Sequence, residues 1–144
     1  MLDVISLSKY VIKLFGDSHS SITNLKLQKV LYYIQGYFMK KYGSEAFAED
    51  IYCWQYGPVV PLAYYEFNHN GARPLVSHIT HANISWQQEQ LIKEIVLKCK
   101  DIPSSRLVNM THQEAPWRNA QIGGIISKES IKRYFNFNNP LGIK

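Results

Sequence analysis

The sequence contains little cysteine and no long hydrophobic run. Its two thiols, Cys53 and Cys99, form no CxxC pair, which suits a reducing cytoplasm better than a disulfide framework. No stretch approaches the roughly 18 continuous apolar residues that a membrane-spanning helix needs. The first residues carry no basic segment of the kind that opens a secretory signal. We therefore expect a cytoplasmic protein without a membrane partner.

Signals of catalysis are also sparse. Neither a GxxxxGK[ST] nor a GxGxxG motif occurs, so a phosphate-binding loop is not supported. Glu49 and Asp50 are adjacent and would point to opposite faces of an extended segment, where they could not share a proton. His78 and His81 lack the second ligand pair that zinc sites usually have. We expect a non-enzyme with no catalytic residue, no cofactor and no metal site.

Strong charge clustering is absent as well. The formal net charge is +5, but the basic residues form no run longer than Lys40-Lys41 or Lys132-Arg133. A dispersed distribution favours a solvated basic surface over a nucleic-acid interface. A basic nucleic-acid-binding protein is therefore the alternative function, and its affinity would fall steeply with salt.

Tyrosine, in contrast, is abundant. Ten tyrosines occur among 144 residues, and aromatic residues make up 13% of the chain. A tyrosine combines a large ring with a hydroxyl group, so it suits half-buried sites and protein interfaces. The length is that of one ordinary domain with a single core.

Residues 23–42 predict a long central helix. Apolar side chains at Leu27, Leu31, Ile34 and Phe38 recur three and four positions apart, which is the stripe that a helix buries. Thr23 or Asn24 can cap the start, and Gly43 can end the helix in a left-handed conformation. A helix of this length is about 30 Å long and can cross a small domain. We expect Leu31 and Ile34 to be fully buried.

Gln28 and Gln35 lie on one face of this helix. A buried amide needs hydrogen-bond partners. The two side chains are therefore either held by loop backbone or left facing a binding partner.

The rest of the chain predicts further short elements. Up to residue 83 they are a helix at 2–15, a short strand at 51–54, a sharp rigid corner at Gly57-Pro58, a helix at 61–67 and a loop at 68–83. A helix then follows a Ser85–Gln88 capping box and ends near Asp101, and another helix runs from 103 until Pro116 ends it. The chain finishes with a turn at Gly123-Gly124, a helix at 127–135 and a tail at 136–144. The fold class is mainly α, a compact single-domain helical bundle around a long central helix with a short extended segment. The domain spans 1–144, with its core at about 2–135.

Two tryptophans lie beside proline-fixed corners. Trp54 and Trp117 are expected to be mainly core residues, and Pro116 could bring the Trp117 ring back against His112. A hydrolase that uses His112 is a third hypothesis. The lack of a partner nucleophile for His112 disfavours the hydrolase hypothesis, so a structural role of His112 is the preferred interpretation.

Three ordered segments carry a family resemblance. They are residues 25–36 (LKLQKVLYYIQG), residues 54–60 (WQYGPVV) and the pair Thr111-His112 with Pro116-Trp117. Together they resemble the Panacea antitoxin domain over about residues 5–135. The expected family-motif or partner-binding residues are Lys26, Gln28, Tyr32, Tyr33, Gln35, Trp54, Tyr56, Gly57, Pro58, Thr111, His112, Pro116 and Trp117.

The resemblance implies an antitoxin of a toxin–antitoxin pair, including phage-associated relatives. Such domains neutralise a cognate toxin, encoded by a neighbouring gene, through direct protein binding. In the SocA-like branch the antitoxin is also a proteolytic adaptor that presents the toxin to the ClpXP protease. We expect Tyr33, Gln35 and Tyr56 to line the toxin-binding surface, with the tyrosines as rigid anchors.

Overall fold

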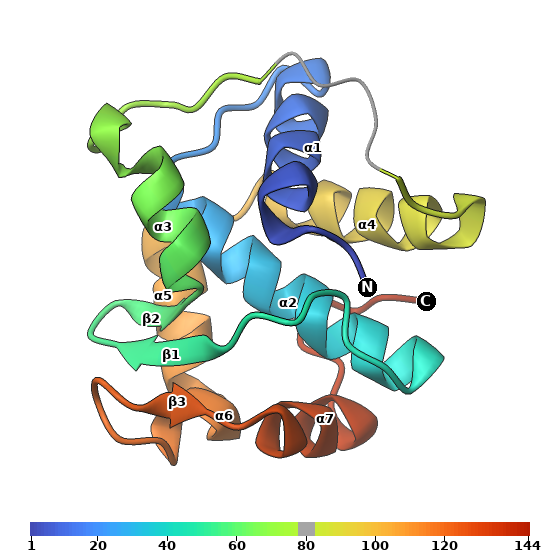
Figure 1. Cartoon of the computed structure of the whole chain (residues 1–144), viewed down its shortest axis with the longest axis vertical. Helices are drawn as coiled ribbons and strands as arrows, with labels where there is room; N and C mark the ends of the chain where they lie inside the picture. Colours follow the sequence, from blue (N-terminus) through green and yellow to red (C-terminus); the bar gives the residue numbers. More distant parts are fainter. Residues whose placement is uncertain (78–82) are drawn as a thin grey trace.

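The computed structural model describes residues 1–77 and 83–144 and has the predicted mainly α architecture (Figure 1). The elements are α1 (Val4–Asp17), α2 (Asn24–Tyr42), β1 (Ile51–Trp54), β2 (Gly57–Val59), α3 (Pro61–Phe67), the 3-10 helix η1 (Asn68–Asn70), α4 (Trp86–Cys99), α5 (Ser104–Gln113), α6 (Ala115–Arg118), β3 (Ile125–Ile126) and α7 (Lys128–Phe137). His78 and His81 lie outside the described residues. In the two described ranges, no helix combines the length and apolar composition that a bilayer span requires.

Helix α2 is the centre of the fold. Every residue from Lys26 to Met39 is buried, and Leu31 and Ile34 are 0% exposed, as predicted. The Thr23 hydroxyl caps the helix by accepting a hydrogen bond from the Lys26 amide at 3.3 Å, and Gly43 ends it with φ 71°. Helices α1, α3, α4, α5 and α7 all pack against it. The central position inferred from periodicity is confirmed.

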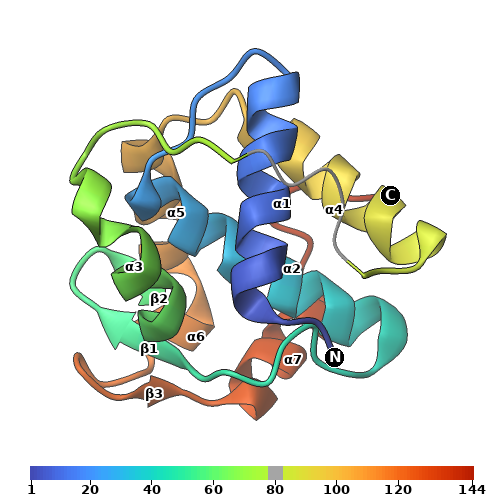
Figure 2. The same cartoon turned by 45° about the horizontal axis from the view of Figure 1, so that its top comes forward.

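Helix α1 covers one side of α2. Its start is capped by Asp3, whose carboxylate accepts a hydrogen bond from the Ser6 amide at 2.8 Å. The helix continues through Gly16 to Asp17, slightly beyond the predicted end. Figure 2 shows α1 lying across α2 with α4 beside it.

A small antiparallel sheet of order β2-β1-β3 lies beside the α2 and α5 helices. Strand β1 matches the predicted strand, but the predicted corner at Gly57-Pro58 is wrong. Both residues lie in β2, opposite Trp54 and Cys53, and the chain turns at Gln55 and Tyr56. The two-residue strand β3 was not predicted, because so short a segment carries no periodicity. It becomes a strand only by pairing with β1.

The C-terminal half follows the prediction with shifted boundaries. The capping box at Ser85 and Gln88 is present, and α4 ends at Cys99. Helix α5 ends at Gln113, so Pro116 does not terminate it and instead lies in the first turn of α6.

The tail after α7 is held in place by the central helix. The Tyr37 hydroxyl donates to Asn139 Oδ1 at 2.7 Å and accepts a hydrogen bond from the Leu141 amide at 2.9 Å. Leu141 is buried in the core. The predicted tail therefore contributes to the packing of the domain.

Candidate functional site

The two motif glutamines hold loop backbone. Gln28 Oε1 accepts a hydrogen bond from the Val60 amide at 2.9 Å. Gln35 Oε1 accepts from the Ala46 amide at 2.8 Å, and its Nε2 donates to the Phe47 carbonyl at 3.0 Å. Of the two possibilities that the sequence leaves open, the structure therefore selects loop backbone. The glutamines attach both ends of the β1–β2 hairpin region to α2.

The motif lysines are also turned inward. Lys29 is 0% exposed, and its Nζ donates to the Pro58 carbonyl at 2.9 Å. Burial lowers the pKa of Lys29 to about 7. Lys26 donates to the Lys100 carbonyl at 3.2 Å and lies over the Phe15 ring. Both lysines are therefore used to hold neighbouring elements against α2.

A buried acidic cluster lies further along the same helix. The Tyr32 hydroxyl donates to Glu114 Oε1 at 2.9 Å, and the Tyr33 hydroxyl donates to Oε2 at 2.8 Å. Glu114 is 4% exposed, and burial raises its pKa to about 7, an effect only partly offset by the two hydrogen bonds. Sequence analysis missed Glu114. The available signal was its place between Thr111-His112 and Pro116-Trp117, inside the third motif segment.

The second and third motif segments meet at the turn of the hairpin. The His112 ring stacks on Trp117 with centroids 3.9 Å apart, as the sequence predicted, and its Nε2 lies 3.0 Å from the Gln55 carbonyl oxygen. Trp117 Nε1 donates to the Trp54 carbonyl at 2.8 Å. The Thr111 hydroxyl donates within its own helix. These contacts fix the hairpin on the α5–α6 corner.

The tryptophans are less buried than predicted. Trp54 and Trp117 are both half-buried; Trp117 packs against the hydrophobic core, whereas the assignment of Trp54 as mainly a core residue is wrong. Trp54 packs edge-on against Tyr64 with ring centroids 5.2 Å apart. Each ring therefore has one side in the fold and one side at the surface.

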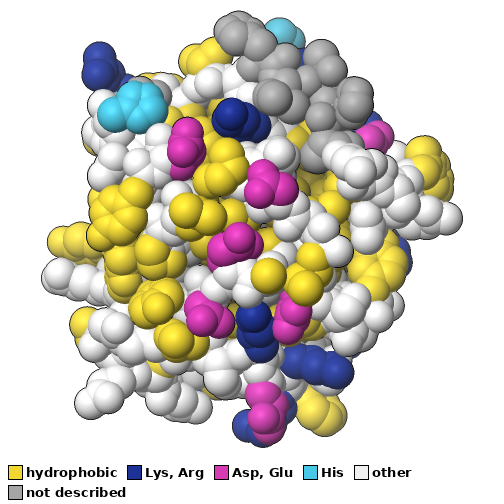
Figure 3. All heavy atoms as spheres, viewed as in Figure 1, with side chains coloured by type: hydrophobic (Ala, Val, Ile, Leu, Met, Phe, Trp, Pro, Cys, Tyr) yellow, Lys and Arg dark blue, Asp and Glu magenta, His cyan; other side chains and the backbone are white. Residues whose placement is uncertain are grey.

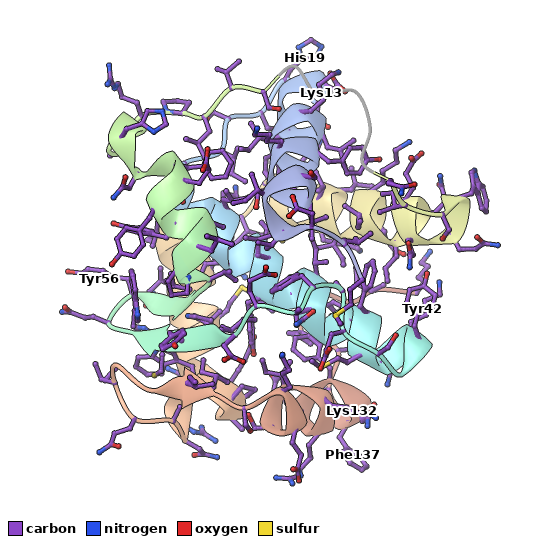
Figure 4. All side chains as sticks on the ribbon, in the orientation of Figure 1. Lys13, His19, Tyr42, Tyr56, Lys132 and Phe137 are labelled. Atoms are coloured by element: carbon purple, nitrogen blue, oxygen red, sulfur yellow. The ribbon has the colours of Figure 1, made fainter. Side chains whose placement is uncertain are left out.

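Two of the three residues expected at a partner surface are not at the surface. Tyr33 and Gln35 are 0% exposed, because other elements cover α2 on every side. The placement of these two at an interface is wrong. Tyr56, in contrast, is 60% exposed at the tip of the hairpin, at the edge of the molecule (Figure 4).

A largely apolar groove opens between the hairpin, the start of α2 and the end of α3, and we call it the aromatic groove. Its volume is about 720 Å³. Its lining consists of Thr23, Asn24, Leu25, Gln28, Trp54, Gln55, Tyr56, Val59, Tyr64, Asn68, Gly71, Ala72, Ser104, Ile122 and Gly123. Neither lysine nor arginine occurs among these described lining residues. Figure 3 shows hydrophobic side chains gathered on this part of the surface, over α3 and the hairpin.

A comparison with models of protein families shows to which family the chain belongs. The model of the family described as "Antitoxin SocA-like, Panacea domain" matches residues 27–118. The chain belongs to this family. The matched range of the Panacea domain contains most of α2, the hairpin, Glu114 and both tryptophans described above, so the resemblance based on the three motif segments is confirmed.

One curated relative of this Panacea domain is Antitoxin SocA of Caulobacter vibrioides (strain NA1000 / CB15N). It is 28% identical over 137 residues, covering 81% of this chain and 73% of that protein. No solved structure matches the chain.

The Panacea motif residues of α2 and those of the hairpin turn have different positions in this structure. Those on α2 are buried and hold the hairpin and the Glu114 cluster, as described above. Trp54 and Tyr56 instead line the aromatic groove. A groove that is lined by the hairpin is thus held in shape by the buried motif residues behind it.

Proposed function

We propose that this member of the SocA-like Panacea family is an antitoxin that neutralises a toxin protein by direct binding through the aromatic groove. The observation that carries this proposal is the groove itself. Tyr56 and Ile122 are each 60% exposed at its rim, while Trp54 and Tyr64 form an aromatic wall. Protein hot spots are enriched in such aromatic residues, which lose little conformational entropy on binding.

The polar groups of the groove also fit a protein ligand. Gln55 and Asn68 place exposed amide side chains among the apolar ones. An amide can both donate and accept hydrogen bonds, so these residues suit the exposed backbone or side chains of a bound polypeptide.

The charge distribution disfavours nucleic acid at this site. Binding to a phosphate backbone depends on lysine and arginine, and neither residue type lines the groove among the described residues. Lys26 and Lys29 are buried in the motif helix and cannot reach a phosphate at the surface. The basic net charge therefore lies elsewhere on the molecule.

Co-expression with the product of the adjacent gene tests the proposal. Expression of that gene alone should arrest growth, and co-expression of this chain should relieve the arrest and yield a copurifying complex. Tyr56→Ala should weaken the complex at least tenfold, because truncation of an aromatic hot-spot residue costs about 2 kcal/mol or more. Trp86→Ala is the matched control, since Trp86 is 70% exposed and does not line the groove.

Two outcomes would oppose the proposal. Growth arrest that this chain does not relieve, or a complex equally tight with Tyr56→Ala and Trp86→Ala, would remove the groove as the toxin-binding surface. Binding to DNA or RNA with a steep salt dependence would favour the alternative function.

Presentation of the bound toxin to a protease such as ClpXP is a further part of this proposal. An adaptor must offer a second surface, and a hollow of about 460 Å³ lies between α6 and α7, lined in part by Tyr134 and Phe137. Phe137 is 84% exposed and projects from α7 (Figure 4). A Phe137→Ala variant that still binds toxin but prolongs the toxin's half-life in cells would support the adaptor role. An unchanged half-life would assign neutralisation to binding alone.

A further inference from the structure

A second hollow continues from the aromatic groove on the other side of Trp54. Its volume is about 510 Å³, and it shares Trp54 and Gly123 with the groove. The segment before β1 supplies Glu49 and Asp50, and the start of α3 supplies Leu62 and Tyr65. We call it the acidic pocket. A ligand that fills the groove can therefore extend into this pocket without leaving the surface.

The charges of the acidic pocket are opposite to the charge of the chain. The protein has a formal net charge of +5, yet Glu49 and Asp50 are the charged residues among those described as lining the pocket. Figure 3 shows acidic side chains beside the hydrophobic ones on this face. A positively charged group would be attracted to this place, and a phosphate would be repelled.

Glu49 has an unused hydrogen-bonding capacity. Its Oε1 is buried, and within the described part of the chain it has no hydrogen-bond partner. Asp50 is less available, because its Oδ1 lies 3.7 Å from the Lys128 ammonium group, which also lies 3.9 Å from Glu45. Burial of an unpaired carboxylate oxygen is unfavourable, so a rotation of the half-buried Glu49 side chain that brings this oxygen to an incoming donor would be favourable.

The aromatic walls of the pocket also favour a cation. Tyr65 is 62% exposed, and its ring lies 6.2 Å from the ring of Trp54. Arginine stacks on aromatic faces while its planar group donates several hydrogen bonds to a carboxylate, and this pocket offers both kinds of contact. A metal ion fits less well, because no group of three possible ligands lies together among the described residues.

We propose that the acidic pocket receives an arginine side chain of the toxin, with its guanidinium group paired with Glu49 and packed against the exposed ring of Tyr65 beside Trp54. The toxin as the source of this side chain rests on the proposed function. The toxin segment that binds here would accordingly be both apolar and basic, with the apolar part in the aromatic groove and the arginine beside Glu49.

The first experiment tests the pocket without the toxin. N-acetyl-arginine amide is titrated into the protein, and the NMR signal of the Trp54 indole is followed, with N-acetyl-citrulline amide as an uncharged probe of nearly the same shape. Arginine amide should shift the Trp54 signal and citrulline amide should not, and Glu49→Gln should abolish the shift. Equal shifts with both probes, or a shift that survives Glu49→Gln, would overturn the proposal.

The second experiment uses the complex with the adjacent gene product. Glu49→Gln should weaken that complex at least about tenfold, the effect expected from removing one partner of a desolvated charge pair. Glu66→Gln is the matched control, because it changes an exposed charge on α3 that lines neither hollow. The unfolding temperature of Glu49→Gln should equal or exceed that of the unchanged protein, since a carboxylate with an unpaired buried oxygen is removed.

The outcomes separate the two proposals. A complex that forms equally well with Glu49→Gln would overturn the arginine pocket and leave the proposed function intact. If no complex forms with the adjacent gene product, the proposed function fails, and the arginine titration alone decides whether the pocket binds a cationic side chain.

Discussion

Tyr32 and Tyr33 donate to the two oxygens of one buried carboxylate, that of Glu114, at 2.9 and 2.8 Å. The carboxylate has no ion pair among the described residues, so its charge is stabilised mainly by these two hydroxyls. Burial consequently raises the pKa of Glu114 from 4.5 to about 7. The third Panacea segment is thereby joined to the centre of α2 by a group that changes charge near neutral pH.

Glu114 should make the protein less stable as the pH rises. Between about pH 4.5 and 7 the folded protein keeps a proton that the unfolded chain releases. The stabilisation that this bound proton provides is fully present below the pKa of Glu114 in the unfolded chain. It is lost as the pH rises through the pKa of Glu114 in the folded protein. We expect the free energy of unfolding, measured by urea denaturation, to fall by about 1–3 kcal/mol over this range.

Glu114→Gln should remove this pH dependence, because an amide carries no titrating proton. Glu129→Gln is the control, since it changes an exposed carboxyl on α7 and should leave the profile unaltered. A Glu114→Gln protein with the same slope between pH 4.5 and 7 would assign the dependence to another group.

Lys29 should have the opposite effect at higher pH. Burial lowers its pKa from 10.5 to about 7, so between these values the unfolded chain holds a proton that the folded protein has released. The associated stability is present above the unfolded-state pKa and is lost as the pH falls through the folded-state pKa. The free energy of unfolding should therefore rise between pH 7 and 9, which places a minimum of stability near neutral pH.

Lys29→Met tests this expectation with a side chain of similar length. The rise between pH 7 and 9 should disappear, and at pH 9 the variant should be less stable by about 1–3 kcal/mol, because the Pro58 carbonyl loses its donor. Lys132→Met changes an exposed lysine on α7 and should keep the rise. A rise that persists in Lys29→Met would assign the pH dependence to another group.

Gly36 should tolerate no side chain, although it lies inside a helix. A Cβ atom there would overlap the ring of Phe135. The Phe135 ring is 0% exposed and packs edge-on against Tyr32 and Tyr37, so it has little room to move. Gly36→Ala should lower the free energy of unfolding by about 1–3 kcal/mol despite the better helix propensity of alanine.

The matched control is Gly16→Ala, another helical glycine. A Cβ atom at Gly16 would meet nothing within 4 Å. This variant should be more stable by about 0.5–1 kcal/mol, because alanine loses less backbone entropy on folding. Equal effects of the two substitutions in thermal or urea denaturation would contradict the close contact between Gly36 and Phe135.

Local features of the chain could be predicted because their causes are local. The periodicity of α2, its Thr23 cap, its terminal Gly43 and the capping box at Ser85 all depend on residues within a few positions of one another. The short strand β1 was recognised from its β-favouring residues. The stacking of Trp117 on His112 followed from the proline between them.

The tertiary structure decided which motif residues are buried and which are exposed. Tyr33 and Glu114 are 81 positions apart and meet only when α5 and α6 pack on α2, so no periodicity could reveal the pair. Packing of the chain also buries Gln35 and leaves Tyr56 at the rim of the groove, and pairing with β1 places Gly57 in a strand. The sequence by itself determined the longer helices, strand β1, their order and the family, because propensity, capping and motif spacing act along the chain. The aromatic groove and the acidic pocket were decided by packing between distant segments, which acts only in three dimensions.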